Sequence, residues 1–241
     1  FTNNHEFVDV VNGRFLINTN KDALNYRLVS IDPNNIDVKN WKPVIAEKNE
    51  KLDAISRVGN KLFCSYLVNA CTKVDIYSLD GKFEKTIKLP GLGTASGFGG
   101  SQKDDHTFYT YTSFNTPPTI FKYDLKSSES TLFKKTNVKI DLENTVVEQM
   151  WFTSKDGSEV PMFVYHRKDV DLKKGPHPTF LYGYGGFNIS LTPSFSIPPS
   201  YFVQQGGVYV VANLRGGGEF GESWHQGGML EHKQNVFDDF I

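Results

Sequence analysis

Two patterns in the sequence predict a β-propeller segment followed by part of an α/β domain. Before residue 136, a group of short β-type segments recurs three times at a period of about 45 residues, which is typical of propeller blades. Beyond residue 137, the apolar runs 179–182 and 208–212 show neither a helical period nor polar alternate positions, as in strands buried on both faces of a parallel sheet. We therefore expect a partial propeller at residues 1–136 and the opening half of an α/β domain at residues 137–241.

Each of the three repeats holds a turn-rich leader and three β-type segments. The leaders end in the turn signals Asn12-Gly13, Gly59-Asn60 and Asp104-Asp105, as hairpins require. The segments are 14–19, 26–32 and 41–46, then 61–66, 74–80 and 83–88, then 107–112, 120–124 and 130–134. Propellers close with roughly four to eight blades, so we expect the chain to be cut at its N-terminus. A β-sandwich is the alternative fold.

A polar crossing at residues 137–144 marks the expected domain boundary. After it, the segments 147–153 and 159–166 flank Asp156-Gly157, a two-residue hairpin signal. Pro161 in the second arm predicts that this arm lies at a sheet edge, because proline cannot donate to a neighbouring strand. The two apolar strands follow, joined by a Pro-rich segment with a short helix expected around residues 201–205.

The C-terminal segment contains a loop, 215–225, that is too glycine-rich for regular structure. A helix is expected to begin near Asn235 as its N-cap, with Asp238 and Asp239 in the first turn, where the helix dipole favours carboxylates. Phe237, Phe240 and Ile241 would form its buried stripe. Since the sheet is then unfinished, we expect the chain to be cut at its C-terminus as well.

The composition excludes several classes of partner. Lys and Arg total 26 against 27 Asp and Glu, a net charge of −1, so we expect neither a nucleic-acid nor an anionic-membrane partner. No apolar run approaches the ~18 residues that cross a bilayer. The only cysteines, Cys64 and Cys71, are too few for a disulfide framework, and we expect two buried free thiols in a reducing compartment.

A glycine cluster follows each apolar strand. Because ligands in open α/β sheets bind beyond the carboxyl ends of the strands, we expect a site between residues 183–186 and 216–218. A dinucleotide-binding turn is disfavoured because Asn188 stands where that motif needs glycine. A metal site is disfavoured because Glu-x-x-His pairs need partners on another helix. The side chains considered for that metal site are Glu222, His225, Glu231 and His232.

The order of elements after residue 145 matches the opening half of an α/β-hydrolase sheet. In that fold, the turn after the third strand supplies part of an oxyanion hole, and the nucleophile follows later on a G-x-S-x-G elbow. The elbow does not occur in the 241 residues, since Ser101 and Ser223 both lack the closing glycine. Nucleophile, acid and base are therefore expected outside this chain, which alone should be inactive.

Three runs of the sequence together resemble the prolyl oligopeptidase family: YGYGGFNIS at 182–190, VVANLRGGGEFGESWHQGG at 210–228 and KQNVFDDF at 233–240. The family consists of serine peptidases that join a seven-bladed propeller to an α/β-hydrolase domain. The resemblance implies a cytosolic, monomeric enzyme without cofactor or metal that cleaves short proline-containing peptides after proline, with the propeller restricting access to a central cavity. A related acyl-aminoacyl or basic-residue oligopeptidase, or a propeller scaffold without catalysis, remains the alternative.

The resemblance assigns roles to two residues. Tyr184 matches the tyrosine whose hydroxyl joins a backbone N–H in the oxyanion hole, and Phe187 matches an aromatic residue that lines the proline pocket. A hydroxyl at the carboxyl end of a strand can donate to a developing oxyanion, and proline is best recognised by a flat aromatic surface. The alternative for both is that they only pack the turn. Arg215, Glu219 and Trp224 lie in a family-like loop, and no role is assigned to them.

Overall fold

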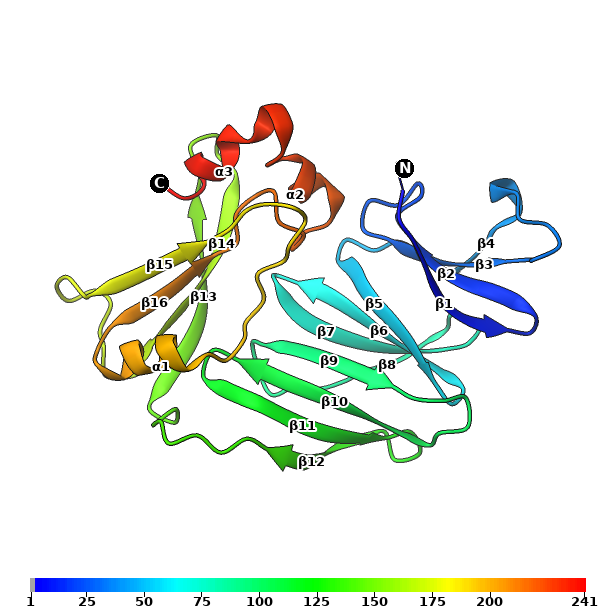
Figure 1. The fold of residues 1–241 in the computed structure, drawn as a ribbon, viewed down its shortest axis with the longest axis horizontal. Helices are drawn as coiled ribbons and strands as arrows, with labels where there is room; N and C mark the ends of the chain where they lie inside the picture. The colour runs from blue at the N-terminus through cyan, green and yellow to red at the C-terminus, as the bar shows by residue number, and fades with distance from the viewer. Residues whose placement is uncertain (1–2) are drawn as a thin grey trace.

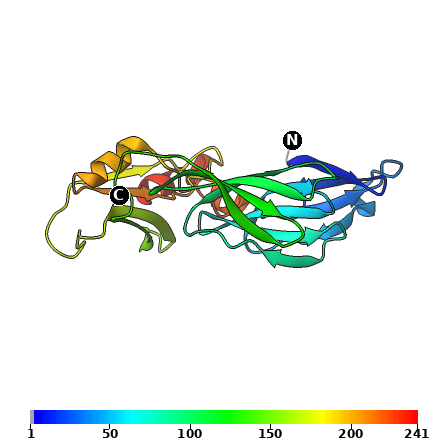
Figure 2. The same ribbon diagram turned by 90° about the horizontal axis from the view of Figure 1, so that it is seen from below.

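The structure is a computed structural model that describes residues 3–241, and the chain forms two units side by side (Figure 1). Within these residues, the first unit holds three antiparallel four-stranded sheets, each made of consecutive strands. Viewed from below, the molecule is elongated, with the first unit at one end and the second at the other (Figure 2). The strands are β1 (His5–Val11), β2 (Arg14–Thr19), β3 (Arg27–Ile31), β4 (Lys42–Ile45), β5 (Lys51–Val58), β6 (Lys61–Val68), β7 (Cys71–Ser78), β8 (Phe83–Thr86), β9 (Thr94–Gly99), β10 (His106–Ser113), β11 (Thr116–Asp124) and β12 (Glu129–Lys135).

The predicted segments of the repeats are strands two, three and four of each sheet. The leaders, expected only as turn-rich segments, are themselves the first strands β1, β5 and β9. Small and glycine residues in β9, which reads TASGFG, weaken its intrinsic β signal. The β1–β2 turn at Asn12-Gly13 has φ +50° and +73°, as hairpin turns of this kind require. Asp104-Asp105 is not such a turn, because residues 100–105 form a longer loop that folds back so that Gly59 N–H donates to Ser101 O.

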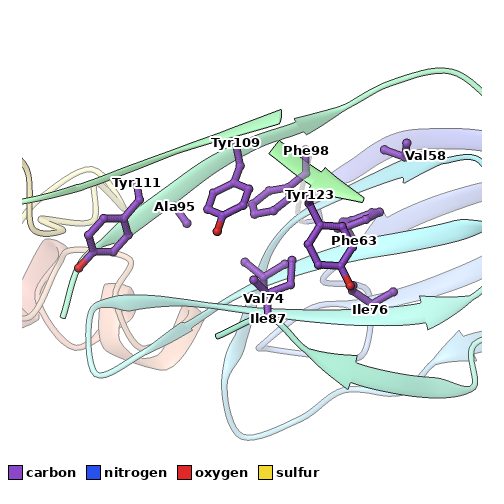
Figure 3. Packing of buried hydrophobic residues seen from close by; sticks show 10 residues of the cluster. All are labelled: Val58, Phe63, Val74, Ile76, Ile87, Ala95, Phe98, Tyr109, Tyr111 and Tyr123. Atoms are coloured by element: carbon purple, nitrogen blue, oxygen red, sulfur yellow. The ribbon is translucent and has the colours of Figure 1, made fainter. Parts of the chain in front are cut away.

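The three sheets stack through clusters of buried side chains between them. Strand β5 lies against both β1 and β9, so the first strands are neighbours, as in propeller blades. Phe63 of the second sheet stacks on Phe98 of the third with ring centroids 5.6 Å apart, and Phe98 stacks in turn on Tyr109 of its own sheet with centroids 4.7 Å apart (Figure 3). Consecutive four-stranded sheets of this kind are not the two facing sheets of a sandwich. Cys64 and Cys71 are buried free thiols, as predicted.

The second unit is built on a mixed sheet with the strand order β13-β14-β16-β15. Its strands are β13 (Thr145–Thr153), β14 (Glu159–Arg167), β15 (Thr179–Gly183) and β16 (Val208–Ala212), and helix α1 (Ile197–Gln204) connects the last two. The predicted parallel pairing of β15 with β16 is confirmed. Burial on both faces holds for β16 but is wrong for β15, whose side chains are largely exposed because β15 is the edge strand of the sheet.

The edge position predicted for Pro161 is wrong. Strand β14 lies inside the sheet, between β13 and β16. Pro161 is tolerated there because the β14–β16 pairing starts only at Met162 and Ala212, one residue further along. At Pro161 itself, the carbonyl oxygen accepts from Asn213 N–H at 2.9 Å, one residue beyond the end of β16, so the N–H that proline lacks falls outside the paired part of the two strands.

The C-terminal segment contains more helix than the sequence predicted. Helix α2 (Glu222–Gln226) and the 3-10 turn η2 (Leu230–His232) precede α3 (Gln234–Asp238). Asn235 is not the N-cap of α3; it lies inside the helix, and its side-chain amide donates to Gly227 O at 2.9 Å. The predicted buried stripe is also wrong, because Val236 is the buried residue of α3 and Phe237, Phe240 and Ile241 are exposed. None of the helices in residues 3–241 has the length and apolarity needed to cross a membrane.

The two units meet through an apolar cluster flanked by hydrogen bonds. Ala70, Cys71 and Phe114 from the first unit pack in one cluster with Phe163, Tyr165, Val203 and Val211 from the second. Beside it, Thr94 Oγ1 donates to Pro193 O at 2.7 Å, and Thr112 Oγ1 accepts from Phe195 N–H at 3.2 Å. The segment that leaves β15 is therefore held against the first unit before it enters α1.

Candidate active site

The two glycine turns meet where the parallel strands β15 and β16 end. Gly183 and Ala212 are the last partners of the pair. Beyond them, Asn188 N–H donates to Gly216 O at 3.1 Å. Gly185 and Gly216 have φ of +59° and +90°, and a Cβ on Gly216 would lie 2.7 Å from Gly185 O. Glycine is required at both positions for backbone conformation and close approach. The two glycine turns thus lie together at this edge of the sheet, and the site expected between them stays a prediction.

A buried ion pair fixes the end of β16. Arg215 Nη2 donates to Asp239 Oδ1 at 2.6 Å, Arg215 Nε donates to Asp239 Oδ2 at 3.0 Å, and Arg215 N–H donates to the same Oδ2 at 3.0 Å. Asp239 is 1% exposed and caps the carboxyl end of α3, whereas the sequence placed it in the first turn of a helix. Its carboxylate needs Arg215 as a partner, because a buried charge left unpaired is strongly unfavourable.

The same guanidinium also reaches the β13–β14 hairpin. Arg215 Nη1 donates to Asp156 Oδ2 at 2.5 Å, and Ser154 Oγ donates to Asp239 Oδ1 at 2.7 Å. The hydrogen bond from Arg215 holds the pKa of Asp156 well below its usual range. Hydrogen bonds to Asp239 and Asp156 in turn raise the pKa of Arg215 although burial opposes this. One arginine thus ties together the hairpin, the end of β16 and α3.

Glu219 and Trp224 also have structural partners that the sequence did not reveal. Glu219 is 1% exposed, and its Oε1 accepts from Leu191 N–H at 2.7 Å and from Asn213 Nδ2 at 3.3 Å. Burial is the main cause that raises the pKa of Glu219. Trp224 Nε1 donates to Leu214 O at 3.1 Å. These partners lie far along the chain or on the backbone, so no local pattern could have identified them.

The first glycine turn is held by the segment before α3. Lys233 Nζ donates to Gly185 O at 2.7 Å. A Cβ on Gly185 would lie 2.4 Å from Val236 Cγ1, so the turn packs directly on α3. On the other turn, His225 Nδ1 lies 2.8 Å from Gly216 O. Among residues 3–241, the four side chains considered for a metal site do not come together as a metal-binding group.

Tyr184 and Phe187 both project from the first glycine turn. Tyr184 is 43% exposed, and its hydroxyl forms no hydrogen bond with residues 3–241. Phe187 is 85% exposed, and its backbone has φ +54°. A phenol with a free donor and an exposed aromatic ring at the carboxyl edge of a parallel sheet can contact a ligand there.

Family profiles and a curated relative both relate this chain to prolyl oligopeptidases. A family profile described as "Prolyl oligopeptidase, N-terminal beta-propeller domain" matches residues 1–136, and one described as "Prolyl oligopeptidase family" matches residues 193–241. A prolyl endopeptidase of Elizabethkingia meningoseptica is 44% identical over 241 residues, which make up 100% of this chain and 34% of that protein. The chain therefore spans about a third of the length of this relative.

Solved structures give the same result. A structure from a mechanistic study of two prolyl endopeptidases matches with a TM-score of 0.94 and 41% identity, over 100% of this chain and 35% of that one. Prolyl oligopeptidase B from Galerina marginata, bound to a 35mer hydrolysis and macrocyclization substrate, matches with a TM-score of 0.92 and 32% identity, over 99% of this chain and 34% of that one. The arrangement of both units is thus shared with these proteins.

The ion pair of Arg215 with Asp239 generates a stability prediction. Asp239→Asn keeps the shape of the side chain but removes the charge that neutralises the guanidinium. We expect the free energy of unfolding, measured by urea denaturation, to fall by about 3 kcal/mol, the lower end of the range for breaking a buried pair, because Asp156 still faces Arg215. Asp238→Asn, one residue away and more exposed, is the control and should change it by less than about 0.5 kcal/mol. Equal losses for the two variants would contradict the role of the ion pair.

Proposed function

Because this chain belongs to the prolyl oligopeptidase family, we propose that the protein carrying it is a serine endopeptidase that cleaves short peptides after proline. The chain joins part of an N-terminal β-propeller domain to the start of the peptidase domain. The relative from Elizabethkingia meningoseptica, described as a prolyl endopeptidase, is similar along the whole chain. The nucleophile, acid and base of the proposed reaction are not among the 241 residues, which contain no G-x-S-x-G elbow.

The observation that carries the proposal is the exposed hydroxyl of Tyr184 at the carboxyl end of β15. Peptide-bond cleavage by a serine passes through a tetrahedral intermediate whose oxygen becomes negatively charged. A donor fixed beside that oxygen stabilises it more than it stabilises the substrate carbonyl, which accelerates the reaction. Tyr184 fits this role because the backbone around it is fixed by Gly185 O accepting from Lys233, while the hydroxyl itself stays unpaired in the residues described.

Phe187 is proposed to form a wall of the pocket for proline. The proline ring lacks an N–H and offers apolar surface, so an aromatic face recognises it without a hydrogen bond. A preference for basic residues would instead need a carboxylate close to the turn. Lys233 Nζ places a positive charge at this turn, and the nearby carboxylate of Glu219 is buried and already accepts from Leu191 N–H, so a cationic substrate side chain is disfavoured there.

The first unit is proposed to restrict access to the site. The sheets β1–β4, β5–β8 and β9–β12 are proposed to be three blades of a seven-bladed propeller whose axis runs beside the first strands. A ring of this kind admits short peptides and excludes folded proteins. We further propose that the enzyme is monomeric, cytosolic and free of cofactors. The cytosol is a reducing compartment, which fits the two buried free thiols Cys64 and Cys71.

Tyr184→Phe tests the proposed reaction, because it removes one oxygen and keeps the ring. In a full-length protein that carries this chain, kcat should fall by about a hundredfold to a thousandfold, equivalent to about 2.7–4 kcal/mol, while KM stays nearly constant. The measurement is steady-state hydrolysis of a proline-containing fluorogenic peptide, with Tyr182→Phe as the matched control, because Tyr182 lies two residues earlier, on β15, and is 42% exposed. A kcat that stays within about threefold of the unchanged enzyme, or a loss that follows a lowered melting temperature, would assign Tyr184 to packing instead.

Phe187→Ala tests the pocket independently of the oxyanion. Discrimination for proline over alanine at the cleavage position should weaken by about 1–3 kcal/mol, the usual value for a hydrophobic pocket contact. The readout is the ratio of kcat/KM for two peptides that differ only at that position. Ile189→Ala, in the same segment and 49% exposed, is the control and should leave the ratio unchanged. An unchanged ratio for Phe187→Ala would show that its ring only covers the turn.

A further inference from the structure

Phe187 and Asn188 form a strained pair of residues in the first glycine turn. Their φ angles are +54° and +57°, in the left-handed region. Residues other than glycine rarely adopt this region, and a bulky one such as phenylalanine does so only where surrounding interactions impose it. The position of the Phe187 ring therefore depends on whatever holds the turn in this conformation.

Four hydrogen bonds hold the segment after Phe187: two join backbone groups, and two at Leu191 involve the side chains of Glu219 and Asn213. Asn188 N–H donates to Gly216 O at 3.1 Å, and Ile189 N–H donates to Gly186 O at 3.0 Å, both of them backbone contacts. The third runs from Leu191 N–H to Glu219 Oε1 at 2.7 Å. Glu219 is thus the side chain through which the second turn holds the first.

Glu219 is itself fixed on several sides. Its Oε1 also accepts from Asn213 Nδ2 at 3.3 Å, and the same Nδ2 donates to Leu191 O at 2.6 Å. Leu191 is therefore held at both its N–H and its carbonyl by Glu219 and Asn213, which are 1% and 0% exposed. Burial raises the pKa of Glu219, and the hydrogen bonds from Leu191 and Asn213, with the positive charge of Lys51 from β5 of the first unit, oppose that rise.

Gly217 provides the space for this carboxylate. A Cβ at this position would lie 2.2 Å from Glu219 Oε2 and 2.9 Å from Ile189 O. Gly217 does not share the left-handed φ of Gly216, so an alanine there would meet a steric clash without added backbone strain. Gly217→Ala therefore displaces the carboxylate without changing Glu219.

From these contacts we infer that Glu219 is a positioning residue for proline specificity: by fixing Leu191, it holds the strained Phe187–Asn188 turn in the conformation that presents the Phe187 ring to substrate. The inference rests on the function proposed above for Phe187. Glu219 does not contact the substrate. Its removal lets the turn relax toward ordinary backbone angles, so the ring leaves the pocket while the rest of the reaction machinery remains.

The experiment measures the ratio of kcat/KM for proline over alanine peptides in a full-length protein that carries this chain. Glu219→Ala should lower this ratio by about tenfold, the lower end of the range for losing a hydrophobic pocket contact. Glu219→Gln keeps an oxygen that accepts from Leu191 N–H and should restore most of the ratio. The exposed Glu231→Ala, in the same C-terminal segment, is the matched control and should not change it.

A double variant separates positioning from general stability. Once Phe187→Ala has removed the ring, adding Glu219→Ala should not lower the ratio further, because both changes act on one contact. Losses that multiply in the double variant, or a single variant that slows both peptides equally and leaves the ratio unchanged, would overturn the inference. If Glu219→Ala does not fold, Gly217→Ala should give the same loss of ratio, and an unaltered ratio there would also overturn it.

Hydrogen exchange gives a readout that does not depend on peptidase activity. Amides of residues 187–191 should exchange faster in Glu219→Ala and Gly217→Ala than in the unchanged protein and in Glu231→Ala. If the protein cleaves no proline peptide, the proposed function fails, whereas faster exchange would still support Glu219 as the clamp of the turn. Unchanged exchange in both variants would reject the clamp whatever the protein cleaves.

Discussion

The ion pair between Arg215 and Asp239 is the interaction on which the geometry of the site depends. Its two charges are buried together and neutralise each other, so removing either one would leave the other as an unpaired buried charge. Through Arg215 it fixes the end of β16, and through Asp239 it fixes α3. Helix α3 packs on Gly185, and Lys233 donates to the Gly185 carbonyl. The position of the first glycine turn therefore also depends on the ion pair of Arg215 with Asp239. The positions of both glycine turns are therefore fixed by groups at the end of β16 and by the segment that contains Lys233 and α3.

Turn residues and runs of apolar residues in the sequence correctly predicted several strands and turns. The hairpin turn at Asn12-Gly13, the strands of the repeats and the parallel pair β15–β16 follow from turn residues and apolar runs, and the structure confirms them. The resemblance to a family was needed for Tyr184 and Phe187, because an exposed tyrosine and phenylalanine have no pattern of their own. What the sequence could not predict are long-range choices. The order β13-β14-β16-β15 buries β14 and leaves β15 at the edge, and nothing near Pro161 or Thr179 encodes it.

The C-terminal segment shows how tertiary partners override local preference. Asn235 has the residue type of an N-cap, yet its amide donates to Gly227 O, and that contact places it inside α3. Asp239 has a residue type that favours the start of a helix, but the buried guanidinium of Arg215 draws it to the helix end. Arg215 and Glu219 were noticed in the sequence without a role because their partners, Asp239 and Leu191, are distant in sequence and are recognised only after the chain has folded.

The proposed reaction requires Tyr184 to stabilise the oxyanion while Phe187 receives the proline ring. The most direct measurement is a crystal structure of a full-length protein that carries this chain, in complex with a peptide aldehyde that ends in proline and forms a hemiacetal with the nucleophile. We expect the Tyr184 hydroxyl at about 2.7–3.1 Å from the hemiacetal oxygen, with the Phe187 ring against the proline. A hemiacetal oxygen bound only by other donors, with the Tyr184 hydroxyl turned away from it, would show that Tyr184 is not the oxyanion donor.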